Sequence, residues 1–263
     1  MTRQAALAGA RIAATRFDGG LLGPLGDDIR PATEADAYRI QAIAHPLLEA
    51  AGFGRQVGWK IGCTTQVMQA YLGIGNPCAG GMFQASVWHG QHAFTVPGAG
   101  GLGVECEIAV RIARDLPARE APYELGDMPG AVAASMAAIE VVQDRYEDYP
   151  SLDTPTLIAD DFFHYACVLG PQDETIGPEA LREVTASMAI NGREVGHGVG
   201  TDILGEPLQA LCWLANNCAT SGTPLLAGDV VLLGSLVQTQ WVEAGDVVTV
   251  ANEPLGQVGA EFA

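Results

Sequence analysis

The sequence predicts an α+β fold, in which a mixed β body follows a small helical segment. Three observations predict it: residues 1–56 carry helical patterns, strand patterns begin at Val57, and residues 227–263 consist of strand and turn patterns. Because the strands stand ahead of and behind isolated helices, they do not form the regular strand–helix alternation of parallel α/β proteins. We therefore expect an N-terminal helical segment at 1–56 and one main domain at 57–263.

The helical segment contains a helix whose start can be located. Thr33 stands before "EADAYRIQAIAHPLLEAA" as an N-cap, and Asp36 takes the place of a capping-box acid three residues later. The glycine-rich stretch at 17–28 predicts a connecting loop.

The first strand is expected at 57–62, "VGWKIG", where apolar residues alternate with Gly58, Lys60 and Gly62. The two glycines leave room for a substrate beside the lysine. The simpler interpretation is a surface lysine whose stem lies along apolar residues.

An uncharged stretch follows this strand. Residues 61–104 contain no Asp, Glu, Lys or Arg in a chain that is 17% charged, whereas about 7 charged residues would be expected there. We expect this stretch to be mostly shielded, in the core or at a subunit contact. A sharper hypothesis is that Lys60 and Glu105, which bracket it, point into a pocket that it helps to enclose.

Further along the chain, helical and strand patterns are again mixed. The expected elements are a helix at 125–138, a strand at 139–146, a loop at 150–165, a strand at 165–170, a helix at 207–222, and strands that begin after the Gly-Asp turns at 228–229 and 245–246.

Composition excludes several classes of partner. Thirteen basic residues against 31 acidic ones give a formal charge of -18, which repels nucleic acid and anionic lipid. Six cysteines without a CxxC pair predict free buried thiols and a reducing compartment. Arg11 and Arg16 interrupt what would be the apolar core of a signal peptide, and no stretch predicts a transmembrane helix. We expect a soluble cytoplasmic protein.

The stretch with the clearest chemistry is "GLGVECEIAV" at 101–110. On a strand, Glu105 and Glu107 share one face and lie roughly 6.6 Å apart along the chain. The plain interpretation is a solvated strand face, but glycines and apolar residues flank the pair. A third carboxylate, Glu140, stands among apolar residues, where a lone charge would be costly to bury. Three carboxylates suit a hard divalent ion such as Mg²⁺ or Mn²⁺.

With these residues in place, the chain resembles the fumarylacetoacetate hydrolase superfamily, and within it the branch of 2-keto-4-pentenoate hydratases and 4-oxalocrotonate decarboxylases. The motifs that carry the resemblance are "WKIGCTT" at 59–65, "YLGIGNPCAGGMF" at 71–83, "VECEIAVRIARDLPA" at 104–118, "AIEVVQDRY" at 138–146, "IADD" at 158–161 and "GEPLQALCWLANNCATSGTPLLAGDVVLLGS" at 205–235.

The resemblance implies a strongly curved β-roll for the catalytic domain at 57–263. It implies that Glu105, Glu107 and Glu140 bind one divalent cation, which in turn holds a short 2-keto acid. Lys60 then serves in proton transfer or enolate stabilisation, with Asp160 as a second catalytic candidate. Three further residues are expected to contact the substrate: Phe163, Ser235 and Leu236.

The sequence also departs from the relatives. Where the well-known pentenoate hydratases carry an aspartate, a candidate acid–base group, this chain has Cys78; the simpler interpretation of Cys78 is an inert buried thiol. Where they read "ADNAS", this chain reads "ADDFF" at 159–163, so the pocket near Asp160 changes shape. His164 follows this stretch and is expected to be a structural histidine.

Four functions therefore stay open. The first is a metal-dependent hydratase of 2-hydroxydienoates, as in the meta-cleavage degradation of aromatic compounds. A 4-oxalocrotonate-type decarboxylase and an acylpyruvate-type C–C hydrolase are the neighbouring alternatives, and a non-catalytic partner subunit is the fourth. A homo-oligomer is expected, and the resemblance adds association with a pathway enzyme as a further expectation.

Overall fold

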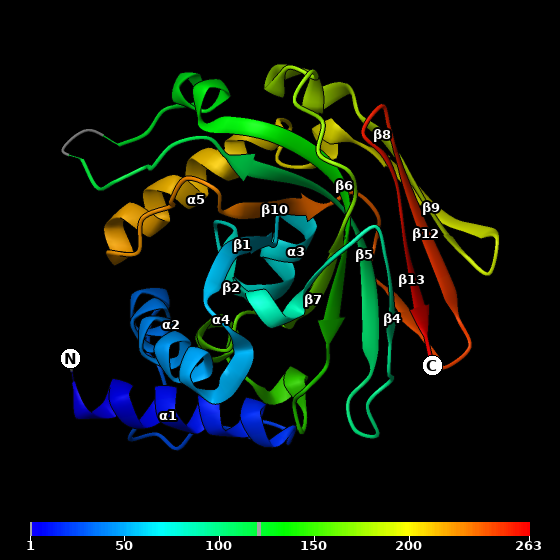
Figure 1. Ribbon diagram of the computed structural model, residues 1–263. Helices are drawn as coiled ribbons and strands as arrows, with labels where there is room; N and C mark the ends of the chain where they lie inside the picture. Colours follow the sequence, from blue (N-terminus) through cyan, green and yellow to red (C-terminus); the bar gives the residue numbers. More distant parts are fainter. Residues whose placement is uncertain (1, 120–121) are drawn as a thin grey trace.

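A computed structural model describes residues 2–119 and 122–263 of the chain (Figure 1). The α-helices are α1 (Arg3–Asp18), α2 (Glu34–Leu48), α3 (Gln66–Leu72), α4 (Thr154–Ala159) and α5 (Pro207–Ser221). The strands are β1 (Gln56–Gly62), β2 (Cys78–Phe83), β3 (Val87–His89), β4 (Gln91–Phe94), β5 (Leu102–Ile112), β6 (Val132–Gln143), β7 (His164–Leu169), β8 (Thr185–Ile190), β9 (Arg193–Val199), β10 (Val230–Ser235), β11 (Gln240–Val242), β12 (Val247–Glu253) and β13 (Gly256–Phe262).

Two mixed sheets form the body of the protein. The larger has eight strands in the order β2-β1-β10-β5-β6-β7-β3, with β11 paired to β5, and the smaller has the order β4-β13-β12-β8-β9. Most neighbours are antiparallel, but β1–β10, β3–β7 and β4–β13 are parallel. In Figure 1 the smaller sheet stands on the right, beside β5 and β6, and α5 crosses the upper left. The predicted mixed α+β class is confirmed.

The N-terminal helices form as their caps predict. Thr33 precedes α2 in an extended conformation, and its side chain accepts a hydrogen bond from the Asp36 N–H. The amide of Gln41, on the inner face of α2, donates to the carbonyl oxygens of Ala79 and Ile158. These buried bonds tie α2 to β2 and α4, so the helical segment packs directly against the elements that carry the site.

One element prediction is wrong: residues 125–138 do not form a helix. Two short 3₁₀ turns occupy Leu125–Asp127 and Pro129–Ala131, and β6 begins at Val132. Alanine is the best helix former when packing does not decide. Here β6 lies between β5 and β7 and also contacts the smaller sheet, so small buried side chains let the layers approach. Burial in the sheet therefore overrides helix propensity.

The loop expected at 150–165 is also interrupted, because Asp153 caps the short helix α4. The predicted strands at 57–62 and 165–170 and the helix at 207–222 are confirmed as β1, β7 and α5.

The uncharged stretch at 61–104 is shielded only in part. Strand β2 is buried throughout. In contrast, α3 has no buried residue and exposes Val67, Met68 and Tyr71. The expectation covers a subunit contact as well as the core, so β2 agrees with it within the single chain, and for α3 it stays a prediction.

All six cysteines are buried free thiols, as expected. Among the described residues, no helix combines the length and the apolar character that crossing a membrane requires.

Candidate metal centre

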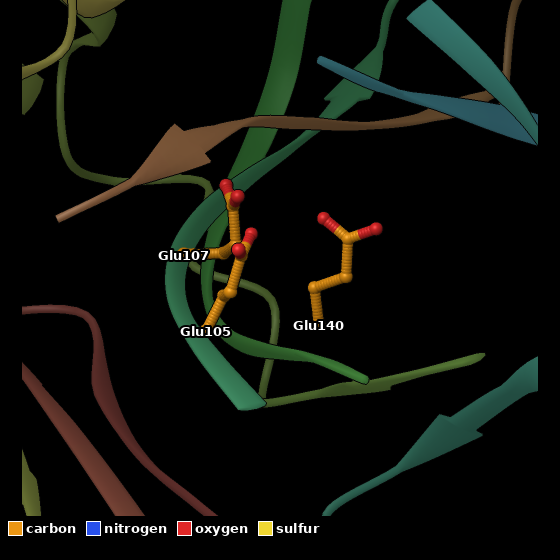
Figure 2. Close-up of side chains that lie close together, drawn as sticks. All are labelled: Glu105, Glu107 and Glu140. Carbon is orange, nitrogen blue, oxygen red and sulfur yellow. The ribbon is translucent and has the colours of Figure 1, made fainter. Parts of the chain in front are cut away.

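Strands β5 and β6 bring the three glutamates together. In their antiparallel register Glu105 lies opposite Glu140, and Glu107 lies two residues further along β5 on the same face. Figure 2 shows the three carboxyl groups gathered at one place, two from β5 and one from β6. One oxygen of each lies within 4.8 Å of the other two. Cys106, on the opposite face of β5, is buried toward the smaller sheet, where its thiol donates to Asn252.

Each carboxylate is held by a group from elsewhere in the chain. Thr239 donates its hydroxyl to Glu105, and the Gly234 N–H donates to Glu107 Oε2 at 2.6 Å. His164 Nδ1 donates to Glu140 Oε1 at 2.8 Å. Such outer contacts fix the orientation of metal-ligating side chains.

The carboxyl groups carry more negative charge than their surroundings compensate. Burial and the neighbouring carboxylates raise the pKa of Glu105 and raise that of Glu107 well above its usual range. Burial acts the same way on Glu140, but Lys60 and His164 outweigh it and lower the pKa of that group. Of the three glutamates, Glu140 therefore has the strongest cationic partners among the described residues.

A divalent cation fits this arrangement. Among the described residues, Glu107 Oε1 and Glu140 Oε2 are buried without a hydrogen-bond partner. Unpaired buried oxygens of this kind are costly unless a ligand satisfies them. An all-oxygen donor set suits Mg²⁺ or Mn²⁺. The three carboxylates come together as the sequence predicts, and their binding of a metal ion stays a prediction.

Lys60 lies beside the carboxylates. Its side chain is 3% exposed, and Nζ lies 3.4 Å from Glu140 Oε1. Burial alone would lower the pKa of Lys60, but Glu140 and Glu105 outweigh it and raise the pKa. The interpretation of Lys60 as a surface residue is wrong.

The glycines on either side of Lys60 were both expected to leave room for a substrate, but each has a different structural role. A Cβ at Gly58 would lie 2.0 Å from the carbonyl oxygen of Val230, so this glycine permits the close approach of β1 and β10. A Cβ at Gly62 would lie 2.9 Å from the ring of Phe162. Only Gly62 therefore opens space beside the lysine, and Phe162 occupies it.

Asp160 and Asp161 are both buried and both paired. Asp160 accepts from Arg145 Nε at 2.7 Å. Asp161 accepts from Arg16 at 2.5 Å and from His45 at 2.8 Å, so it links the turn after α4 to both N-terminal helices. A catalytic role for Asp160 stays a prediction, and its ion pair favours an anchoring role.

The two phenylalanines of the "ADDFF" turn contact different neighbours. Phe162 faces the site, with its ring centroid 4.9 Å from Lys60 Nζ. Phe163 packs instead against Tyr146 and Tyr149. Asp161, Phe162 and Phe163 all have positive φ angles, an uncommon run for non-glycine residues. Phe162 is therefore the residue of the pair that borders Lys60.

Ser235 is the last residue of β10 and Leu236 follows it, next to Glu107. Ser235 pairs with Glu107 in the register of β10 and β5, and its hydroxyl donates to the carbonyl oxygen of Val237. The Leu236 N–H donates to the carbonyl of Cys106. That these residues, or Phe163, contact a substrate stays a prediction.

Three groups that hold the glutamates are not predicted as such from the sequence. Thr239 and the Gly234 N–H reach the glutamates from more than 120 positions away, and His164, which was expected to be merely structural, holds Glu140. No local pattern marks Thr239 or Gly234, whereas the position of His164 directly after "ADDFF" was a usable signal.

Comparisons with known proteins agree with this geometry. The chain is 34% identical over 253 residues to a protein from Paraburkholderia phymatum named 2-keto-4-pentenoate hydratase, covering 96% of this chain and 95% of that protein. It is 30% identical to a 2-hydroxyhexa-2,4-dienoate hydratase from Comamonas testosteroni, covering 92% and 90%. Among solved structures, 4-oxalocrotonate decarboxylase from Pseudomonas putida G7, complexed with magnesium and adipate, matches with a TM-score of 0.89 and 27% identity over 100% of this chain and 99% of that one.

The family model for the fumarylacetoacetate hydrolase C-terminal domain matches residues 80–263, which include all three glutamates. On this match and on the identity to the hydratases, the chain belongs to the fumarylacetoacetate hydrolase family.

Proposed function

We propose that the protein is a divalent-metal-dependent hydratase of 2-hydroxy-2,4-dienoates, the enol forms of unsaturated 2-keto acids, as in the meta-cleavage degradation of aromatic compounds. The observation that carries the proposal is the cluster of Glu105, Glu107 and Glu140 beside Lys60, in which Glu107 and Glu140 are fully buried. The names of the relatives, 2-keto-4-pentenoate hydratase and 2-hydroxyhexa-2,4-dienoate hydratase, supply the reaction.

Each residue of the site has a separate role in the proposed reaction. A divalent cation held by the three carboxylates would draw electron density from the carboxylate and 2-oxo oxygens of a keto acid and so stabilise its enolate form. Lys60, at the edge of the cluster, donates to a substrate oxygen or delivers a proton to the carbon chain. His164 keeps Glu140 oriented, and the Phe162 ring keeps water away from the chain beyond the reacting carbons.

The charges around the site favour a substrate with an uncharged tail. Three well-shielded basic side chains already have carboxylate partners: Lys60 with Glu140, Arg145 with Asp160 and Arg16 with Asp161. Phe162 and Cys78 flank Gly62. Phe162 has no ionisable group, and the Cys78 thiol stays uncharged because burial raises its pKa well above the usual range. A second carboxylate on the substrate would therefore face an aromatic ring and a thiol, and would be costly to bury.

Decarboxylation is the second candidate function. It is supported by the close structural match to 4-oxalocrotonate decarboxylase over the whole chain. A dicarboxylate substrate would need a free cation near Phe162, and the pairing described above opposes this. A non-catalytic role is opposed by the three glutamates and Lys60, which a scaffold would not need.

We also infer that the larger sheet curves into the roll that family membership implies. Lys60 on β1 meets Glu140 on β6, although β10 and β5 lie between these strands. With neighbouring strands about 4.8 Å apart, β1 and β6 of a flat sheet would be separated by about 14 Å. Curvature toward the site explains the contact. The catalytic domain would then comprise residues 57–263, with 1–56 as a helical segment packed on it.

We further propose that the protein is a homo-oligomer. Helix α3 carries no charge and exposes Val67, Met68 and Tyr71, a surface that a second copy would shield.

A substrate panel with product analysis tests the proposed reaction. The Mg²⁺-loaded protein is given 2-hydroxypenta-2,4-dienoate, 2-hydroxyhexa-2,4-dienoate and the dicarboxylate 2-hydroxymuconate, and the loss of the dienol absorbance is followed. Hydration of the two monocarboxylates, abolished by EDTA and restored by Mg²⁺ or Mn²⁺, is expected. Release of CO₂ from the dicarboxylate as the faster reaction would replace the hydratase proposal by the decarboxylase one.

A further inference from the structure

Two thiols meet beside the site. Cys63 follows the last residue of β1, and Cys78 is the first residue of the antiparallel strand β2, opposite Gly62. The Cys78 thiol donates to Cys63 Sγ across 3.6 Å, and both side chains are buried. Two other thiols donate instead to oxygen atoms, Cys106 to Asn252 and Cys212 to the Tyr123 carbonyl.

The pair lies within reach of the reactive groups. The point where a Cβ at Gly62 would stand is 2.9 Å from the Phe162 ring and 3.3 Å from Cys78 Sγ. The Phe162 ring in turn covers Lys60 Nζ. The Cys78 sulfur and the Phe162 ring therefore border the same position on β1, two residues from Lys60.

We propose that Cys63 and Cys78 are an oxidisable dithiol, which a hydroperoxide converts to a disulfide, and that this modification lowers the activity of the neighbouring site. The two sulfur atoms are already in contact, although Cys63 lies one residue beyond the Gly62–Cys78 pair and has a positive φ of 58°. The sulfur atoms must approach from 3.6 Å to about 2.0 Å, a movement within the range of side-chain rotation.

The chemistry balances with one peroxide as the oxidant. The Cys63 sulfur, which accepts the hydrogen bond and is the more exposed of the two at 6%, attacks the distal peroxide oxygen. The O–O bond breaks, the leaving oxygen takes a proton as an alcohol or water, and Cys63 becomes a sulfenic acid. The Cys78 sulfur then attacks the Cys63 sulfur, the S–O bond breaks, and the leaving hydroxide takes the Cys78 proton as water. The two thiols lose two electrons, which the peroxide gains.

The first test is chemical and does not depend on the proposed function. The metal-loaded protein is treated with hydrogen peroxide, free thiols are alkylated, and peptides are mapped by mass spectrometry without reduction. A linked Cys63–Cys78 peptide that dithiothreitol removes is expected. Absence of this peptide, with both cysteines alkylated after denaturation, would overturn the proposal whether or not the protein is a hydratase.

The second test links the disulfide to activity and rests on the proposed function. Turnover of the dienoate that the untreated protein hydrates is expected to fall about 10-fold or more as the linked fraction rises, and to recover with dithiothreitol. A misplacement of about 1 Å near the chemistry can cost about 100-fold, so a smaller displacement suffices for this loss. Cys63→Ser must abolish both the link and the reversible loss. Cys212→Ser, which removes a distant thiol, must retain both. Full activity in the linked protein, or the same reversible loss in Cys63→Ser, would refute the coupling.

Discussion

The ion pairs of Asp161 offer a quantitative test of how the N-terminal helices hold the site. Its carboxylate accepts from Arg16 at 2.5 Å, from His45 at 2.8 Å and from the Gly81 N–H at 2.8 Å, and its side chain is 2% exposed. Asp161→Asn preserves the shape, and asparagine tolerates the positive φ of this residue. The substitution therefore isolates the charge.

The expected magnitude follows from burial. Removing one partner of a buried ion pair leaves an uncompensated charge and costs about 3–5 kcal/mol. In the variant, the new NH₂ group also faces an N–H donor. For a chain of this size, 1 kcal/mol shifts Tm by about 2–4 °C, so Asp161→Asn should melt about 6–20 °C below the wild type at pH 7.

The pH dependence has a definite sign. Burial would raise the pKa of Asp161, but His45, Arg16 and the Gly81 N–H outweigh it and hold the pKa well below the usual range. A group whose pKa is lower in the folded state stabilises the fold above its unfolded pKa of about 3.9 and loses this contribution as the pH falls further. The difference in Tm between wild type and Asp161→Asn should therefore be full at pH 5–7 and shrink below about pH 4.

Melting curves followed by circular dichroism between pH 3 and pH 7 measure both effects. Asp27→Asn is the control, since the Asp27 side chain is 96% exposed and its pair with Arg30 spans 3.3 Å; exposed pairs contribute about 0–1 kcal/mol. An Asp161→Asn protein that melts within the shift of this control at pH 7 would refute the structural role given to Asp161.

Three further predictions concern the site. Lys60→Met should lower kcat by about 100-fold or more with nearly unchanged metal affinity; near wild-type turnover on the identified substrate would make Lys60 a structural residue. Phe162→Lys should improve the binding of 2-oxoadipate relative to 2-oxohexanoate, as measured by calorimetry in Mg²⁺, because under the proposed function it places a cation beside the tail of the substrate. An unchanged ratio, with Phe162→Leu as the control, would reject Phe162 as the wall beside this tail. Gly58→Ala should destabilise the fold by about 1–3 kcal/mol, because its Cβ would meet the Val230 carbonyl 2.0 Å away; a melt like the wild type would show that β1 and β10 can separate.

Much of the site followed from local pattern. The alternation of β5 places Glu105 and Glu107 on one face, and an acidic residue in an apolar run, Glu140, had to have a buried partner. The sequence pattern does not predict which distant strands pair with β5. Thr239 and the Gly234 N–H reach the glutamates only because β10 and β11 both pair with β5.

Two errors have the same origin. From the sequence alone, the alanines of β6 indicate a helix, but in the structure β6 lies in the larger sheet and contacts the smaller one. Likewise, Gly58 suggests space for a substrate, but in the structure Val230 lies against it. In both cases a neighbour distant in sequence decides between two locally reasonable interpretations. The bonds of Asp161 to Arg16 and His45 are likewise long-range, and no pattern around residue 161 indicates them.

The most direct measurement of the central claim is a calorimetric titration of Glu107→Gln with Mn²⁺ and Mg²⁺, beside the wild type and the exposed control Glu243→Gln. The wild type and Glu243→Gln should each bind one ion per chain. Glu107→Gln should lose most of this binding. Its metal-free form should melt no lower than the wild type, because burial and the neighbouring carboxylates already disfavour the charged form of Glu107 and raise its pKa. One ion bound by Glu107→Gln with unchanged affinity would contradict a metal centre at Glu105, Glu107 and Glu140.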